Sequence, residues 1–78
     1  MLTSGQIRAA RALLDWSQQQ LADESGVSLA TVRRIESERG PERSTVPNRD
    51  AIQRALEKGG IIFMPKNSDG GAGVRLKR

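Results

Sequence analysis

The first stretch with a clear pattern of apolar and polar positions covers residues 4–14. Ile7, Ala10 and Leu14 recur there at the spacing of one face of a helix. Thr3 and Gln6 precede and begin this stretch as a capping box, in which a hydroxyl and an amide satisfy backbone groups that the first helical turn leaves unpaired. The pattern therefore predicts a first helix from about Ser4 to Leu14.

Residues 17–36 contain two further helix starts on either side of a glycine. Ser17 has Gln20 three residues later, and Ser28 has Thr31 three residues later, so each serine is a candidate N-cap. Gly26 lies between them, where a helix can end in the left-handed conformation that glycine adopts most easily. The segment is predicted to form a helix, a tight turn and a second helix.

The second of these helices has one apolar face and one basic face. Val32 and Ile35 are three residues apart, and the pair Arg33 and Arg34 falls on the opposite side. We therefore expect this helix to pack through Val32 and Ile35 and to present its arginines to the surroundings.

The remaining chain is predicted to hold a loop, a fourth helix and a hairpin. Gly40-Pro41 and Val46-Pro47 are expected to stop helices, which gives a loop of roughly ten residues. Asn48 is the predicted N-cap of a helix over residues 48–58, which Gly59-Gly60 ends. Residues 61–64 and 74–78 then read as two short strands joined by a flexible glycine-rich loop.

Composition limits the chemistry that the chain can perform. Its 78 residues make one small domain, and the absence of cysteine and histidine removes disulfides, thiol nucleophiles and the usual transition-metal sites. No apolar run approaches the roughly 20 residues of a membrane span, so we expect a cytoplasmic protein. The net charge of +4 suits a polyanionic partner.

An enzyme is the function class with least support. The acidic residues of the helical part are scattered at helix ends and exposed faces, without an apolar pocket or a basic partner nearby: Asp15, Asp23, Glu24 and Asp50. We therefore expect no catalytic residues, no metal and no cofactor.

The helix-turn-helix segment resembles that of the phage-repressor-like family, also called lambda-repressor-like or Xre-type, of bacterial DNA-binding proteins. The resemblance rests on these residues at fixed spacing: Ser17, Gln18, Leu21, Ala22, Gly26, Val27, Ser28, Thr31, Val32, Ile35 and Glu36. It implies a mainly α, four-helix lambda-repressor-like DNA-binding domain in residues 1–60, followed by the β-hairpin of residues 61–78. It also implies a transcriptional regulator, in the first instance a repressor, that binds double-stranded DNA.

A helix that enters the major groove presents its first turn and the outward positions one turn later. In this chain those positions are Ser28, Leu29, Ala30, Arg33 and Arg34. The resemblance places base contacts at Leu29, Ala30 and Arg34. Since arginine can bind guanine through two hydrogen bonds whereas leucine and alanine offer apolar contact only, specificity is expected to rest on Arg34 and on DNA shape.

The expected contacts to the DNA backbone come from two places. The resemblance implies contacts from Gln18, Ser28 and Thr31. The loop beyond the second helix adds three candidates, Arg39, Arg43 and Ser44, which either bind phosphates beside the groove or are simply solvated.

Arg11 lies on the apolar side of the first helix, one turn before Leu14. In the family that this sequence resembles, an arginine at this position pairs with the glutamate that matches Glu36. The alternative is that Arg11 extends to solvent. A pair would fix the first helix against the third without contacting DNA.

The strand of residues 61–64 is apolar at every position: Ile61, Ile62, Phe63 and Met64. A strand shows its side chains to two faces, and the helices of so small a domain can cover one of them. A second copy of the chain is the predicted cover, which makes these residues a dimer interface. The alternatives are a hairpin folded wholly onto its own domain and, for the whole protein, an antitoxin whose C-terminal segment holds a toxin.

Overall fold

The structure of the chain is a computed structural model, which describes residues 2–37 and 40–77 and, for Arg43, the backbone alone. Its elements are α1 (Ser4–Leu14), α2 (Gln18–Ser25), α3 (Leu29–Ile35), a short 3-10 helix (Pro41–Arg43), α4 (Val46–Lys58), β1 (Ile61–Met64) and β2 (Gly73–Leu76). The predicted fold class, four helices followed by a two-stranded hairpin, is confirmed.

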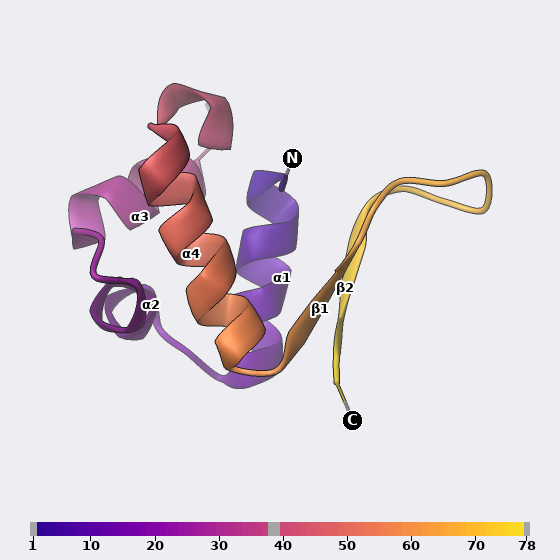
Figure 1. The fold of residues 1–78 in the computed structure, drawn as a ribbon, viewed down its shortest axis with the longest axis horizontal. Helices are drawn as coiled ribbons and strands as arrows, with labels where there is room; N and C mark the ends of the chain where they lie inside the picture. Colours follow the sequence, from indigo (N-terminus) through magenta and orange to yellow (C-terminus); the bar gives the residue numbers. More distant parts are fainter. Residues whose placement is uncertain (1, 38–39, 78) are drawn as a thin grey trace.

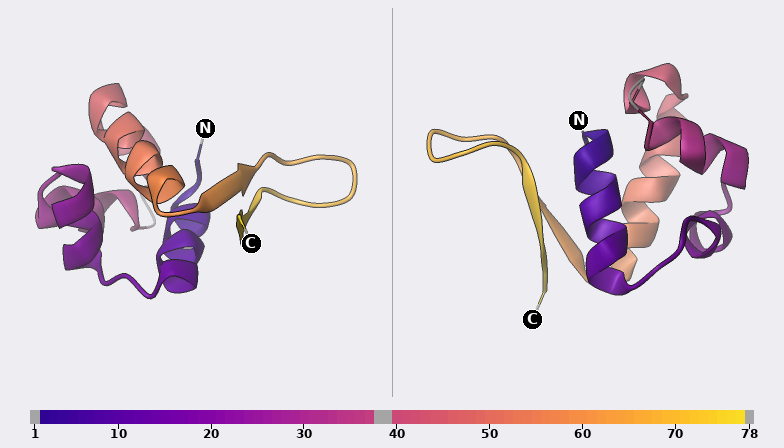
Figure 2. Two further views of the ribbon diagram at one scale, coloured as in Figure 1. Left: turned by 60° about the horizontal axis from the view of Figure 1, so that its bottom comes forward. Right: turned by 180° about the vertical axis from the view of Figure 1, so that it is seen from behind.

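The helix-turn-helix and the hairpin lie on opposite sides of the molecule. Helices α1 and α4 stand side by side in the middle, α2 and α3 flank them on one side, and β1 and β2 flank them on the other (Figures 1 and 2). The loop between the strands projects away from the helices. The exposed surface of α3 and the hairpin therefore lie on different sides of the molecule.

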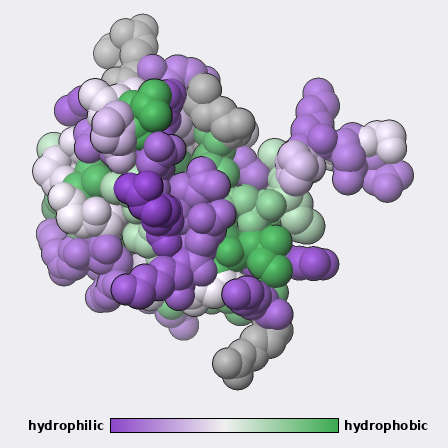
Figure 3. Space-filling model, in the orientation of Figure 1, coloured by the Kyte–Doolittle hydropathy of each residue, from purple (hydrophilic) through white to green (hydrophobic). Residues whose placement is uncertain are grey.

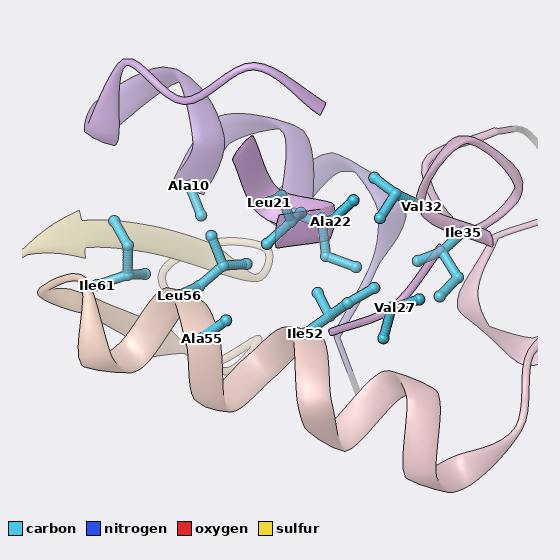
Figure 4. Packing of buried hydrophobic residues seen from close by; sticks show 11 residues of the cluster. Ala10, Leu21, Ala22, Val27, Val32, Ile35, Ile52, Ala55, Leu56 and Ile61 are labelled. Atoms are coloured by element: carbon cyan, nitrogen blue, oxygen red, sulfur yellow. The ribbon is translucent and has the colours of Figure 1, made fainter. Parts of the chain in front are cut away.

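The core forms where α4 faces the first three helices. Ile52 and Leu56 of α4 are fully buried and point towards Leu21 and Ala22 of α2 (Figure 4). The buried apolar residues are Ile7, Ala10, Leu21, Ala22, Val27, Val32, Ile35, Ile52, Ala55, Leu56 and Ile61. Because this cluster draws on all four helices and on β1, the helix-turn-helix and the hairpin pack on one common core.

The predicted helix starts in the first half of the chain are largely as expected. Thr3 and Gln6 form the complete capping box, with Gln6 N donating to Thr3 Oγ1 at 3.0 Å and Thr3 N donating to Gln6 Oε1 at 2.9 Å. Ser17 caps α2 by accepting from Gln20 N. The spacing of Ser17 and Gln20 also predicts a capping box, and this prediction is wrong, because the Gln20 amide donates to Glu24 Oε2 one turn further on.

The start of α4 was also predicted wrongly. The N-cap is Thr45, whose hydroxyl accepts from Asn48 N, and the helix begins at Val46 with Pro47 in its first turn. A proline there costs little, because the first turn has no intrahelical partner for its N–H and the fixed φ of proline suits a helix. The connection from α3 is correspondingly shorter and includes the 3-10 helix.

The hairpin divides its side chains between two faces. In the antiparallel register Ile61 pairs with Leu76 and Phe63 with Val74. Ile61, Phe63 and Val74 pack in or against the core, whereas Leu76 is exposed. Ile61 is only 3% exposed and belongs to the core. Its assignment to a dimer interface is therefore a misprediction, because its own domain already covers it.

One buried polar side chain fastens the hairpin to α1. The Gln6 amide donates both to Met64 O at 3.3 Å and to Gly73 O at 3.0 Å, while its oxygen caps the helix. Gln6 is buried, and these bonds span more than 50 residues of sequence. The position of the hairpin is thus set by apolar packing and by a specific pair of hydrogen bonds.

Candidate nucleic-acid interface

Helices α2 and α3 meet through a tight turn that only a few side chains permit. Gly26 ends α2 with φ of +73°, the left-handed conformation expected for it. Ala22 and Val27 are buried on either side of the turn. Ser28 then starts α3 by accepting from Thr31 N at 3.1 Å. The sequence thus fixes this unit locally, through one glycine and one cap.

Helix α3 has the two faces that its sequence predicts. Val32 and Ile35 are fully buried, whereas Ala30, Arg33 and Arg34 are exposed. Leu29 is half-buried and packs against the core, so only part of its side chain is open to a ligand. The open face of α3 therefore consists mainly of one methyl group and two guanidinium groups.

The three side chains expected at the DNA backbone from the resemblance lie near the N-termini of α2 and α3. The Ser28 hydroxyl is exposed and donates to Thr31 Oγ1 at 2.9 Å. Gln18 is half-buried, and its amide donates to Glu36 Oε1 at 3.2 Å. Since a glutamine amide has two N–H groups, this bond leaves one donor of Gln18 for another acceptor.

Among the side chains that the structure describes, none of the three loop residues predicted to contact the DNA backbone is in a position to do so. Arg39 and the side chain of Arg43 lie outside the described part of the chain. Ser44 departs from the expectation, because its Oγ is buried and has no hydrogen-bond partner among the described residues. Ser44 N donates to Pro41 O at the end of the 3-10 helix, and the residue follows that turn with its hydroxyl inward. It is not placed to meet a phosphate.

Arg11 and Glu36 are brought together across 25 residues of sequence. Arg11 Nε lies 2.8 Å from Glu36 Oε2, and Nη2 lies 2.9 Å from Oε1. The side chains are 20% and 2% exposed, respectively. Hydrogen bonding to Glu36 raises the pKa of Arg11 above its ordinary value, so its positive charge persists throughout the range in which the protein would be handled.

Glu36 is the meeting point of more contacts than the sequence revealed. Besides the ion pair and the Gln18 bond, its backbone carbonyl accepts from Arg8 Nη1 at 2.5 Å. Sequence reasoning overlooked Arg8. The available signal was its spacing, because Arg8 and Arg11 are three residues apart and share one face of α1.

The described residues hold no group of three or more acidic, histidine or cysteine side chains that could bind a metal ion. None of the described helices is long and apolar enough to cross a membrane.

A family model described as Helix-turn-helix matches residues 7–46, just over half of the chain. The match runs from α1 through α2 and α3 to the first residue of α4, and it leaves out the hairpin. A comparison with curated proteins gives no match.

Proposed function

Because the chain belongs to the lambda-repressor-like, Xre-type helix-turn-helix family, we propose that it is a sequence-specific transcriptional repressor that reads the major groove with α3. The observation that supports this proposal is that α3 has one buried face and one exposed face. Val32 and Ile35 hold the helix in the core, while Arg33 and Arg34 extend from the other side. A helix that is held on one face and presents arginines on the other is suited to enter the major groove.

The chemistry of the open face indicates how DNA would be read. Arg34 can bind O6 and N7 of guanine through two hydrogen bonds, and Ala30 can contact a thymine methyl group. The positive net charge adds an attraction to phosphates that does not depend on sequence. We therefore expect only a few side chains to read bases directly. The shape of the DNA would add further specificity.

The experiment that tests this proposal is selection of bound sequences from a random pool of DNA duplexes. The full chain should enrich a defined motif that contains guanine, and its affinity should fall steeply as salt increases, because phosphate contacts release counterions. Recovery of the pool without enrichment would contradict sequence-specific binding.

Arg34→Ala tests the assignment of the recognition helix. The variant should lose preference at one or two positions of the motif, by about 1–3 kcal/mol each, because the paired hydrogen bonds to guanine are gone. Repeating the selection with the variant measures this directly. The matched control is Arg54→Ala, which removes an equal charge from an exposed position on α4.

An unchanged motif for Arg34→Ala would show that another surface reads the bases. Equal loss of affinity for all duplexes would instead make Arg34 a phosphate contact.

We further propose that the protein acts as a homodimer joined through the outer face of its hairpin. With Ile61 and Phe63 turned to their own core, Ile62 and Met64 of β1 remain partly exposed, and Ile62 lies opposite Arg75 in the register. A hydrophobic area lies over the hairpin beside the hydrophilic surface of the helices (Figure 3). Two copies would carry two recognition helices roughly 34 Å apart, or a multiple of it, which suits an inverted-repeat operator.

Ile62→Lys should convert such a dimer into a monomer, because an ammonium group in an apolar interface loses its hydration, and Arg75, its cross-strand neighbour, carries the same charge. Sedimentation at micromolar concentration would measure the change. Ala12→Lys, at an exposed position on α1, is the control. Deletion of residues 61–78 is a poor test, since it also removes Ile61 from the core. A wild-type chain that sediments as a monomer, together with an operator that lacks two-fold symmetry, would contradict the proposed homodimer.

An antitoxin is the second candidate function. It is favoured by a groove of about 600 Å³ between the N-terminal turn of α1 and the hairpin, whose lining includes Leu2, Phe63 and Met64. The groove is on the hairpin side of the molecule, so a bound segment would leave α3 free (Figure 1). Co-expression with a neighbouring small open reading frame, followed by co-purification of the two products, would support this function.

A further inference from the structure

The C-terminal end of α3 is not closed in the way that the end of α2 is. Helix α2 stops at the left-handed Gly26, whereas α3 stops at Glu36 in an ordinary right-handed conformation, with φ of −82° and ψ of −5°. The helix is only seven residues long. A helix this short has little stability of its own, so contacts from elsewhere must fix where its end lies.

Besides the buried Val32 and Ile35, two arginines on one face of α1 supply such contacts. Arg11 binds the carboxylate of Glu36, and Arg8 binds the backbone carbonyl of the same residue through Nη1 at 2.5 Å. A guanidinium beside a helix C-terminus also interacts favourably with the partial negative charge of the exposed carbonyl groups. Main chain and side chain of Glu36 are therefore held separately.

The two arginines restrain Glu36 to different degrees, because the carboxylate can move relative to the helix and the backbone carbonyl cannot. The Glu36 carboxylate is linked to its backbone by three rotatable bonds, so a bond to it tolerates some movement of the helix. The carbonyl is part of the backbone, so a bond to it fixes the helix end directly. Arg34 is two residues before this carbonyl, and its own carbonyl accepts from Ser37 N at 3.2 Å. Movement of the Glu36 carbonyl would therefore move Arg34.

Base readout is sensitive to such movement. A pair of hydrogen bonds between a guanidinium and guanine needs donor–acceptor distances near 2.9 Å and nearly straight geometry at both bonds. We propose that Arg8 is a positioning residue for DNA readout, which holds the end of the recognition helix through the Glu36 carbonyl so that Arg34 reaches its base. This inference rests on the proposed DNA-binding function and adds to it a residue that touches no base.

The test compares full-length variants on the selected duplex and on a duplex in which the guanine expected to meet Arg34 is replaced. Arg8→Met keeps much of the apolar stem and removes the donors. Its preference for the selected duplex should fall about tenfold, which is the effect of losing one good base contact. Arg8→Lys keeps a cationic donor and should retain part of the preference. Arg54→Met, with the same charge loss at an exposed site on α4, should retain all of it.

Measurement of affinity against salt concentration separates positioning from the other roles. For Arg8→Met the salt slope should match that of Arg54→Met. Equal weakening on both duplexes with a slope lower by about one would make Arg8 a phosphate contact and overturn the inference. An unchanged preference with a lower Tm would also overturn it, because Arg8 would then contribute to stability alone.

All measurements are made well below the lowest Tm among the variants, and Arg8→Leu, which also lacks a donor, replaces Arg8→Met if the latter does not fold. A wild-type chain without sequence preference would remove the proposed function itself. A wild-type chain with a preference that Arg8→Met retains would remove this inference alone.

Discussion

Replacement of Arg11 by methionine is expected to lower the free energy of unfolding by about 3 kcal/mol. The loss arises less from the missing attraction than from what remains, since the 2% exposed Glu36 carboxylate would be left with Gln18 as its only side-chain partner among the described residues. Thermal or urea unfolding, followed by circular dichroism, measures the change. The result tests whether the ion pair fixes α1 against α3.

The double variant Arg11→Met/Glu36→Met distinguishes a stranded charge from lost packing. Replacing both partners by apolar side chains of similar length removes the buried charge altogether, so most of the lost stability should return. A double variant as unstable as Arg11→Met would show that the loss arises at position 11 itself, through poor packing of methionine or through the missing hydrogen bond from Arg11 Nη1 to Trp16 O, which is 2.9 Å long.

Gln6→Glu is expected to lower the free energy of unfolding by a similar amount, about 3 kcal/mol. The two side chains have nearly the same shape, and the substitution replaces the amide nitrogen by an oxygen. The amide nitrogen of Gln6 donates to Met64 O and Gly73 O, and a carboxylate would direct an acceptor at both carbonyl groups. Burial against two carbonyl oxygens also raises the pKa of the new carboxyl. Because protonation restores a donor, the destabilisation should be larger at pH 7 than at pH 4.

Gln6→Met is the matched control, since it removes the hydrogen bonds without burying a charge. Gln6→Met should lower the free energy of unfolding by about 1–2 kcal/mol. This difference from the wild-type chain should be the same at pH 4 and at pH 7. Hydrogen exchange at the amides of β1 and β2 should quicken more in Gln6→Glu than in Gln6→Met. Equal stabilities for the two variants would indicate that the amide does not lie between the two carbonyl groups.

The helix-turn-helix could be predicted from sequence because each of its parts is decided within a few residues. Ser28 caps α3 through the N–H of Thr31, only three residues away, and Gly26 supplies a backbone conformation that depends on its own missing side chain. The spacing of Val32 and Ile35 fixed which face of α3 is buried. Such local signals are readable before any tertiary contact is known.

The start of α4 and the orientation of β1 were not decidable in that way. Pro47 is compatible with a loop or with a first helical turn, and nothing within a few residues distinguishes the two. Four consecutive apolar residues in β1 carry no alternation, so the sequence cannot say whether Ile61 or Ile62 faces inward. The register with β2 and the packing on α4 made Ile61 the core residue.

The sequence alone therefore determined the helices around the turn, the basic face of α3 and the family, because caps, glycines and apolar spacing act over a single helical turn. Tertiary structure alone decided that the Ser44 hydroxyl turns inward and that Arg8 donates a hydrogen bond to the Glu36 carbonyl. It also decided that Gln6 joins α1 to the hairpin. These contacts link residues far apart in the chain or depend on how a loop packs, and a polar side chain carries no pattern that names its distant partner.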